Sequence, residues 1–243
     1  MNESALYIGT SGWTYDHWKG VFYPADIKKR EWLTFYAERF DTVELNASFY
    51  RIPKIKAVEG WRDRTPEKFH FAVKVSRLIS HIKRLKECDK EAEWFFSVFK
   101  PLEPKIGAYL VQLPPSLTYD PERIESFIER YPSDIPLVFE FRNNSWYNDE
   151  TYTLFRKKNL AFCIHDMHGS ATDRIVTSDC AYIRFHGYTA RYGGDYPDEI
   201  LADWAAWIRG MRREVKRMFC YFNNDFQGYA IKNCLRLLEM ATA

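Results

Sequence analysis

The chain has 243 residues, of which 46% are hydrophobic and 17% aromatic, so it can bury a large core and is not disordered. Its 35 Lys and Arg against 33 Asp and Glu leave a formal charge of +2, which excludes a protein whose whole surface binds nucleic acid. No apolar run reaches the roughly 18 residues of a membrane span, and the first residues do not resemble a signal peptide. We therefore expect a cytoplasmic protein.

Short segments rich in β-branched and aromatic residues recur along the chain and predict eight strands. In chain order they are 6–10, 42–47, 69–75, 107–113, 136–142, 160–166, 180–186 and 218–224. Between them, apolar residues three and four positions apart predict helices over 30–40, 54–62, 88–99, 121–131, 149–159, 199–215 and 230–240. The crossover 167–179 is too polar and too short for a helix to be predicted there.

This alternation of strand and helix requires parallel strands joined by crossover helices. Eight repeats in a chain of this length fit a closed barrel better than an open doubly wound sheet. No linker, repeat or low-complexity tract divides the chain. We predict a single α/β domain over residues 1–243, a (β/α)₈ or TIM barrel.

Polar side chains gather at the carboxyl ends of the predicted strands. They stand two residues apart in strands two, three, five and seven, whereas strands six and eight offer adjacent residues, and in strand eight the inward register is ambiguous. In a barrel these ends surround one mouth, where barrel enzymes build their sites. The candidates are Glu44, Asn46, Lys74, Ser76, Gln112, Glu140, Arg142, His165, Asp166, Arg184, His186, Asn223, Asn224 and Asp225. Burying charges is costly unless they pair, so a purely structural salt network is the alternative to a functional pocket.

Several motifs recur in one known family. They are IGTSGW (8–13), VELN (43–46), QLPP (112–115), EFR (140–142), RFHG (184–187) and YFNN (221–224). In this order they resemble the family known as domain of unknown function 72 (DUF72), or YecE-like, over essentially the whole chain. The resemblance implies a TIM barrel distantly similar to sugar isomerases and endonuclease IV, with no established reaction. Two positions depart from the family pattern: Tyr188, where relatives often carry Arg, and Asp225, where they often carry His.

Loops beside the predicted mouth carry further candidates. Residues 9–13 leave the first strand through two glycines, so backbone N–H groups there could face an anion, or the glycines could serve only a tight turn. Trp13, Tyr15 and Trp18 could stack on a base or sugar ring, or could simply cover the rim. The loop 77–90 contains His81 among basic residues and suits either a phosphate-bearing ligand or plain solvation. The loop 187–196 resembles a lid.

The leading hypothesis is an enzyme, hydrolase-like, that acts on an anionic, phosphate-bearing or nucleic-acid substrate. Lys74, Arg142 and Arg184 would hold the anion. Glu44 or Glu140 would be the general base, and His186 the general acid. Further substrate contacts are expected from Ser11, Trp13, Tyr15, Asn46, His81, Gln112 and Asn223.

Two other classes of function stay open. A non-catalytic nucleic-acid-binding protein would use the basic loop and the rim aromatics. A metal-assisted sugar isomerase or epimerase would use carboxylates and imidazoles at the strand ends. No fixed-spacing ligand motif is present, so no metal or cofactor is predicted, although a divalent metal remains an alternative. The expected partner is an anionic small molecule or nucleic-acid fragment, and the oligomeric state is not predicted.

Overall fold

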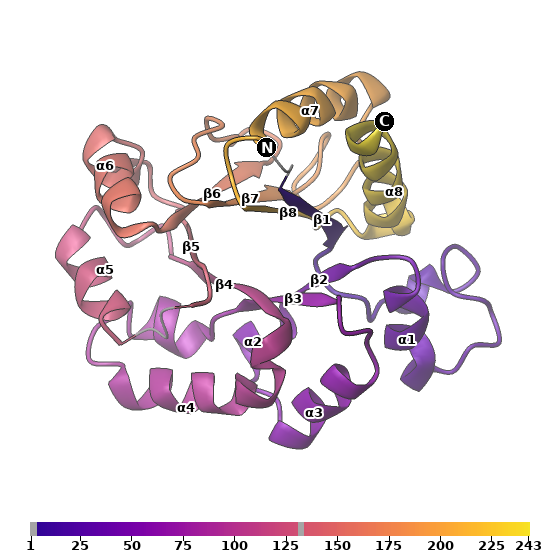
Figure 1. Ribbon diagram of the computed structural model, residues 1–243, viewed down its shortest axis with the longest axis horizontal. Coiled ribbons are helices and arrows are strands. Elements are labelled where there is room, and N and C mark those ends of the chain that lie inside the picture. Colours follow the sequence, from indigo (N-terminus) through magenta and orange to yellow (C-terminus); the bar gives the residue numbers. More distant parts are fainter. Residues whose placement is uncertain (1–3, 131–133) are drawn as a thin grey trace.

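A computed structural model describes residues 4–130 and 134–243, in which eight parallel strands curl into a nearly closed barrel with helices outside (Figure 1). The strands are β1 Ala5–Thr10, β2 Thr42–Leu45, β3 His70–Lys74, β4 Ile106–Gln112, β5 Leu137–Glu140, β6 Ala161–Asp166, β7 Cys180–Phe185 and β8 Arg217–Phe222. The helices are α1 Trp32–Ala37, α2 Ala47–Tyr50, α3 Ile55–Asp63, α4 Asp89–Phe99, α5 Pro121–Ile128, α6 Asp149–Lys158, α7 Asp198–Met211 and α8 Tyr229–Thr242. The predicted TIM barrel and its eight strands are confirmed.

Local sequence signals account for the ends of the outer helices. Asp120 accepts a hydrogen bond from the Arg123 amide at the start of α5, and Asn148 accepts one from Thr151 at the start of α6. The predicted end of the helix 121–131, at residue 131, lies outside the described residues. The observed second strand, β2, ends at Leu45 and is shorter than the predicted 42–47, because after Asn46 the chain enters the short helix α2.

The sixth crossover, residues 167–179, contains no helix, and all of it is described. Two threonines bind it to the strand before it instead. Thr172 Oγ1 accepts from the His165 amide at 3.0 Å, while Thr177 Oγ1 accepts from Phe162 and donates to the Leu160 carbonyl. This segment therefore follows β6 without forming a helix, and its threonine side chains bond to backbone groups in and beside that strand.

The barrel interior is filled because large side chains on one side of the barrel pack against smaller ones on the other. Tyr7, Tyr182, Phe219 and Tyr221 project inward from β1, β7 and β8, and alanines, a leucine and a valine face them from β3 to β6. A side chain at Gly107 would clash, because its Cβ would lie 2.4 Å from the Phe219 ring. This packed interior closes the barrel below the mouth.

Between β1 and β2 the barrel is closed by hydrogen bonds to the side chain of Tyr36. Within the described residues no ladder of backbone hydrogen bonds joins these two strands. The Tyr36 hydroxyl of α1 accepts from the Thr10 amide at 3.0 Å and donates to the Thr42 carbonyl at 3.1 Å. The strands are close, since a Cβ at Gly9 would lie 2.3 Å from the Thr42 oxygen. We call this the seam.

The five cysteines are free and buried, and burial raises their pKa values, as expected for thiols packed as small hydrophobic groups. None of the described helices has both the length and the apolar character that crossing a membrane requires.

Candidate active site at the barrel mouth

Strand ends direct polar side chains into the same mouth of the barrel. The sheet register pairs Gln112 of β4 with Glu140 of β5. Arg184 of β7 bridges from Glu140 to Glu44 of β2 on the far side. Side chains two residues apart on a strand point the same way, which accounts for the convergence. The structure thus brings these predicted positions into one site.

Glu44 is a fully buried carboxylate whose oxygens are occupied by donors. Oε1 accepts from Ser11 Oγ at 2.7 Å, from Asn46 Nδ2 at 3.1 Å and from Arg184 Nη2 at 2.7 Å. Oε2 accepts from the Tyr182 hydroxyl at 2.7 Å. Burial alone would raise the pKa of Glu44, but the charge of Arg184 and these bonds outweigh it and lower the pKa. Glu44 is therefore a charged carboxylate with little free capacity to accept.

Glu140 is buried to the same extent and is equally occupied. Oε2 accepts from Arg184 Nη1 at 2.5 Å and from Gln112 Nε2 at 2.7 Å. Oε1 accepts from Arg142 and lies 3.3 Å from His186 Nε2. Burial opposes ionisation, but the charges of Arg184 and Arg142 hold the pKa of Glu140 well below its usual range. A lowered pKa makes either glutamate a weak general base.

His186 is fully buried, and burial together with the charge of Arg184 lowers its pKa to about 3. Its Nε2 faces Glu140, and its Nδ1 lies 3.3 Å from Asn223 Nδ2. Arg142 Nη2 lies 3.1 Å from Nε2 but already donates to Glu140. The proton is best placed on Nε2, so that Nδ1 accepts from Asn223 Nδ2. With a pKa of about 3 the imidazole is neutral near pH 7 and has no readily released proton, so these surroundings do not favour the predicted general-acid role.

Lys74 carries the positive charge that the cluster leaves unbalanced, because the two arginines offset the two glutamates. Its Nζ lies 4.2 Å above the Phe49 ring and donates to Gln112 Oε1 at 3.0 Å. Within the described residues Gln112 is its single hydrogen-bond acceptor, so two of three N–H donors remain open. Burial first, and then the charge of Arg184, lowers the pKa of Lys74 to about 8.

A hollow of about 260 Å³, here called the mouth pocket, opens above these side chains. Its described lining consists of cations, amides and phenols and includes no acidic residue, because the two glutamates lie beneath it. The lining residues are Tyr15, Asn46, Tyr50, Lys74, Gln112, Arg184, Tyr192 and Asn223. Such a wall is suited to an anion.

Other predicted residues lie around this pocket without lining it. Ser11 and Trp13 line a second hollow beside it. His81 packs against the Phe49 ring at 4.9 Å, and burial lowers its pKa to about 4. Of the two roles left open for Trp18, the structure excludes stacking on a ligand, because this side chain is wholly buried and donates through Nε1 to the Asp225 carbonyl at 3.3 Å.

Two strand-end residues expected at the mouth serve the outer layer instead. Asp166 accepts from Trp204 Nε1 at 3.0 Å and contacts the Tyr196 hydroxyl at 3.3 Å. Asn224 donates to the Asn233 side chain at 2.9 Å. Asp166 ends β6, and Asn224 follows β8. In each case the residue just before it is the last one that points into the barrel. Because side chains alternate along a strand, Asp166 and Asn224 point toward the helices.

Sequence reasoning missed three tyrosines of the site. Tyr182, which holds Glu44, stands two residues before Arg184 on β7, and the period of two could have revealed it. Tyr50 of α2 and Tyr192 of the loop 187–196 line the mouth pocket. Nothing in the local pattern distinguishes these two from other exposed tyrosines.

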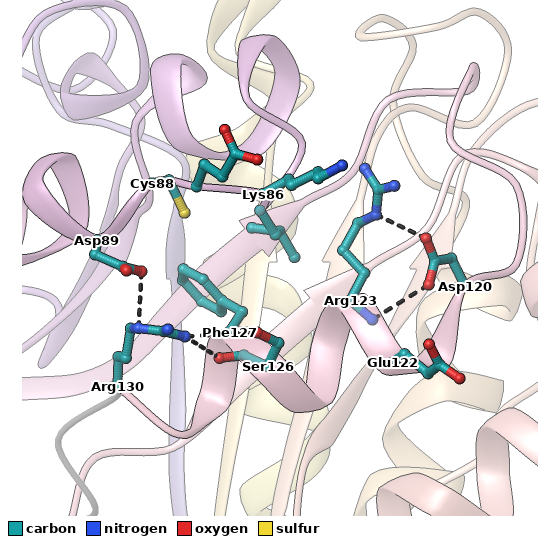
Figure 2. A pocket seen from close by; sticks show the side chains of 11 residues that line it. Lys86, Cys88, Asp89, Asp120, Glu122, Arg123, Ser126, Phe127 and Arg130 are labelled. Carbon is teal, nitrogen blue, oxygen red and sulfur yellow. Dashed lines mark hydrogen bonds and ion pairs between the residues drawn. The ribbon is translucent and has the colours of Figure 1, made fainter.

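One cation of the basic loop after β3 is neutralised by a neighbour. Lys83 forms an ion pair with Glu91 at 2.8 Å and donates to the Glu87 carbonyl. Lys86 lines a separate hollow of about 480 Å³ between α4 and α5, outside the barrel. Figure 2 shows that charged groups of this hollow pair with one another, Arg130 with Asp89 and Arg123 with Asp120. Within the loop, the ion pair of Lys83 removes one cation from those available to a polyanion.

The strand-end carboxylates and imidazoles are not arranged as metal ligands. Within residues 4–130 and 134–243, no group of three or more His, Cys, Asp and Glu side chains is placed to hold an ion. Arg142 and Arg184 occupy the space beside Glu140 that a cation would need. His165 is buried, and neither of its ring nitrogens has a hydrogen-bond partner among the described residues.

Comparison with known proteins gives consistent matches. Residues 7–243 match the family model described as protein of unknown function DUF72. UPF0759 protein YunF of Bacillus subtilis (strain 168) is 28% identical over 268 residues, covering 97% of this chain and 94% of the relative. UPF0759 protein YecE of Escherichia coli (strain K12) is 31% identical over 156 residues, covering 62% of this chain and 54% of the relative. The crystal structure of a DUF72 family protein from Thermotoga maritima superposes with a TM-score of 0.89 at 31% identity, covering 98% of this chain and all of that one.

Proposed function

The chain belongs to the DUF72 family, and from the geometry of its site we propose that the mouth pocket binds a small phosphate-bearing anion and hydrolyses it. One observation carries the proposal. Lys74 is 8% exposed, faces the pocket, and has two N–H donors without a partner among the described residues. A nearly buried ammonium without a paired carboxylate is costly, and a bound anion would offset that cost.

The amides around Lys74 complete the proposed anion site. Gln112 and Asn46 each donate an amide N–H to a glutamate below the pocket, which fixes their orientation. Arg184 shares its guanidinium between both glutamates, so its charge is present at the base of the pocket without being free to move. A preorganised positive wall of this kind stabilises negative charge at a fixed place.

For the hydrolytic step we assign proton acceptance to His186. Glu140 holds the Nε2 proton, and Nδ1 faces Asn223, which lines the mouth pocket. This order of carboxylate, imidazole and pocket is the one that orients a general base. A bound phosphate would raise the pKa of His186 from about 3 toward the range in which a base is effective.

The binding half is tested by titrating the protein with inorganic phosphate at low ionic strength in a calorimeter. Lys74→Met should weaken binding about tenfold or more, while exposed Lys157→Met on α6 should leave it unchanged. Absence of phosphate binding by the wild-type protein would reject the proposal.

The catalytic half is tested with bis(p-nitrophenyl) phosphate, whose hydrolysis releases a coloured product. His186→Gln should abolish turnover and leave the affinity for inorganic phosphate within about twofold of wild type. Retained turnover in this variant would remove His186 from the scheme without affecting the binding half.

The basic loop is the feature that non-catalytic nucleic-acid binding would need, and the ion pair of Lys83 gives that alternative no added support. Nucleic-acid binding therefore stays a prediction. Retention of DNA at low salt would support it if that retention is lost when Lys83, Arg84 and Lys86 are neutralised.

A further inference from the structure

A second hollow of about 340 Å³ adjoins the mouth pocket on the side of β1 and β2. Tyr15 and Asn46 line both hollows, so the two form adjoining parts of one surface. None of the described residues that line the second hollow is charged. Its lining is made by residues 11–15, residues 45–48 and Trp61. A neutral compartment next to a cationic one suits a ligand with two chemically different ends.

Two tryptophans form the apolar part of this hollow. Trp13 follows β1 and Trp61 projects from α3, and their ring centroids lie 5.9 Å apart at an interplanar angle of 86°. The loop of Trp13 is held in place, because the Tyr23 hydroxyl donates to its carbonyl at 2.6 Å. Both side chains are partly exposed, so indole surface remains available to a planar group.

Asn46 stands at the junction with an unused acceptor. Its Nδ2 donates to Glu44 Oε1 at 3.1 Å, which fixes the orientation of the amide. Its Oδ1 is buried and has no hydrogen-bond partner among the described residues. An orphaned acceptor of this kind costs free energy until a donor reaches it, so an N–H or O–H of a ligand would be favoured here.

We propose that the two hollows form a bipartite site for a phosphorylated molecule with a planar ring, of the chemistry of a nucleoside monophosphate. The phosphate lies against Lys74, the ring packs on Trp61, and a donor between them reaches Asn46 Oδ1. This inference rests on the proposed phosphate site and adds the class of substrate to it.

The test compares the affinities of adenosine 5′-monophosphate, ribose 5-phosphate, inorganic phosphate and adenosine for the wild-type protein and for W61L and W61F. The wild type should bind the monophosphate about tenfold more tightly than ribose 5-phosphate. W61L should remove this advantage and leave ribose 5-phosphate binding unchanged, whereas W61F should keep part of it. W94L, at an exposed tryptophan of α4, is the matched control and should behave as wild type.

The outcomes separate the two proposals. Phosphate binding without any gain from the ring, or equal weakening of all phosphorylated probes in W61L, overturns the bipartite site and leaves the proposed function standing. Adenosine binding that W61L abolishes, with no phosphorylated probe bound more tightly than adenosine, supports the ring hollow and rejects the phosphate site. Absence of binding by every probe overturns both.

Discussion

The floor of the barrel mouth and its wall are built from similar polar groups, yet their hydrogen bonding differs sharply. In the floor, formed by Glu44, Glu140 and Arg184, both carboxylates are occupied and the arginine bridges them, although its buried Nε has no partner among the described residues. In the wall, Lys74 has donors and Asn46 an acceptor without partners among the described residues. Occupied groups hold the structure together, whereas open groups are available to a ligand. The contrast separates the stabilising part of the cluster from the binding part.

The largest expected effect comes from breaking the floor at Arg184. Arg184→Met leaves two buried carboxylates without their shared cation, so we expect a loss of about 3–5 kcal/mol in the free energy of unfolding. Urea denaturation at pH 7 measures it. Arg236→Met, which removes an exposed ion pair with Asp198, is the control and should change stability little. A loss no greater than in the control would mean that the floor does not stabilise the fold.

A smaller effect is expected from a single donor of the floor. Tyr182→Phe removes the hydroxyl that donates to Glu44 Oε2 and should cost about 1.5–3 kcal/mol in the same denaturation experiment. Tyr229→Phe, at a hydroxyl that bonds to Gln227 on the surface, serves as the control. Equal stability of the two variants would contradict the assigned role of Tyr182.

The pH dependence of anion binding tests whether Lys74 of the wall contacts the anion. Lys74 loses its proton as the pH rises through about 8, so affinity for sulfate, which stays a dianion, should fall about tenfold between pH 7 and pH 9. Lys74→Arg stays charged over this range and should abolish the dependence. Calorimetric titration at both pH values measures it, and a flat wild-type profile would exclude Lys74 as the anion contact.

The smallest effect on stability is expected at Lys74 itself. Its pKa in the folded protein, about 8, lies below its ordinary value of 10.5, so the folded state binds this proton more weakly than the unfolded state. Protonated Lys74 therefore opposes folding below pH 8, and the cost declines as the pH rises toward 10.5. Lys74→Met should therefore be at least as stable to unfolding as wild type at pH 7. Any advantage in stability over wild type should be smaller at pH 10. Thermal unfolding at both pH values measures the difference. A marked destabilisation of Lys74→Met would contradict this expectation and would assign Lys74 to the floor.

The sequence predicted the barrel and its polar mouth because both follow from short-range periodicity. Alternation of strands and helices determined the topology, and the spacing of two placed Glu140 and Arg184 at the same end of neighbouring parts of the barrel. At the ends of β6 and β8 adjacent polar residues were all candidates, and the sequence did not decide which of them face the mouth. The structure directs Asp166 and Asn224 outward, because at a strand end a shift of one residue changes the face that a side chain takes.

The pairing state of each charge could not be predicted from the sequence. Glu44 and Arg184 are 140 positions apart and meet only because the strands close into a barrel. Trp61 reaches the mouth from a helix that in sequence is indistinguishable from the other outer helices. Such contacts depend on tertiary packing, which local patterns do not encode.

The seam has a consequence for how the protein assembles. Backbone pairing of the other strands can form as each arrives, but β1 and β2 are joined through the hydroxyl of Tyr36, which α1 must first carry into place. Ring closure and docking of this helix should then be a single step. The amide hydrogen of Thr10 would accordingly exchange with solvent whenever α1 lifts away, even while the rest of the sheet remains protected.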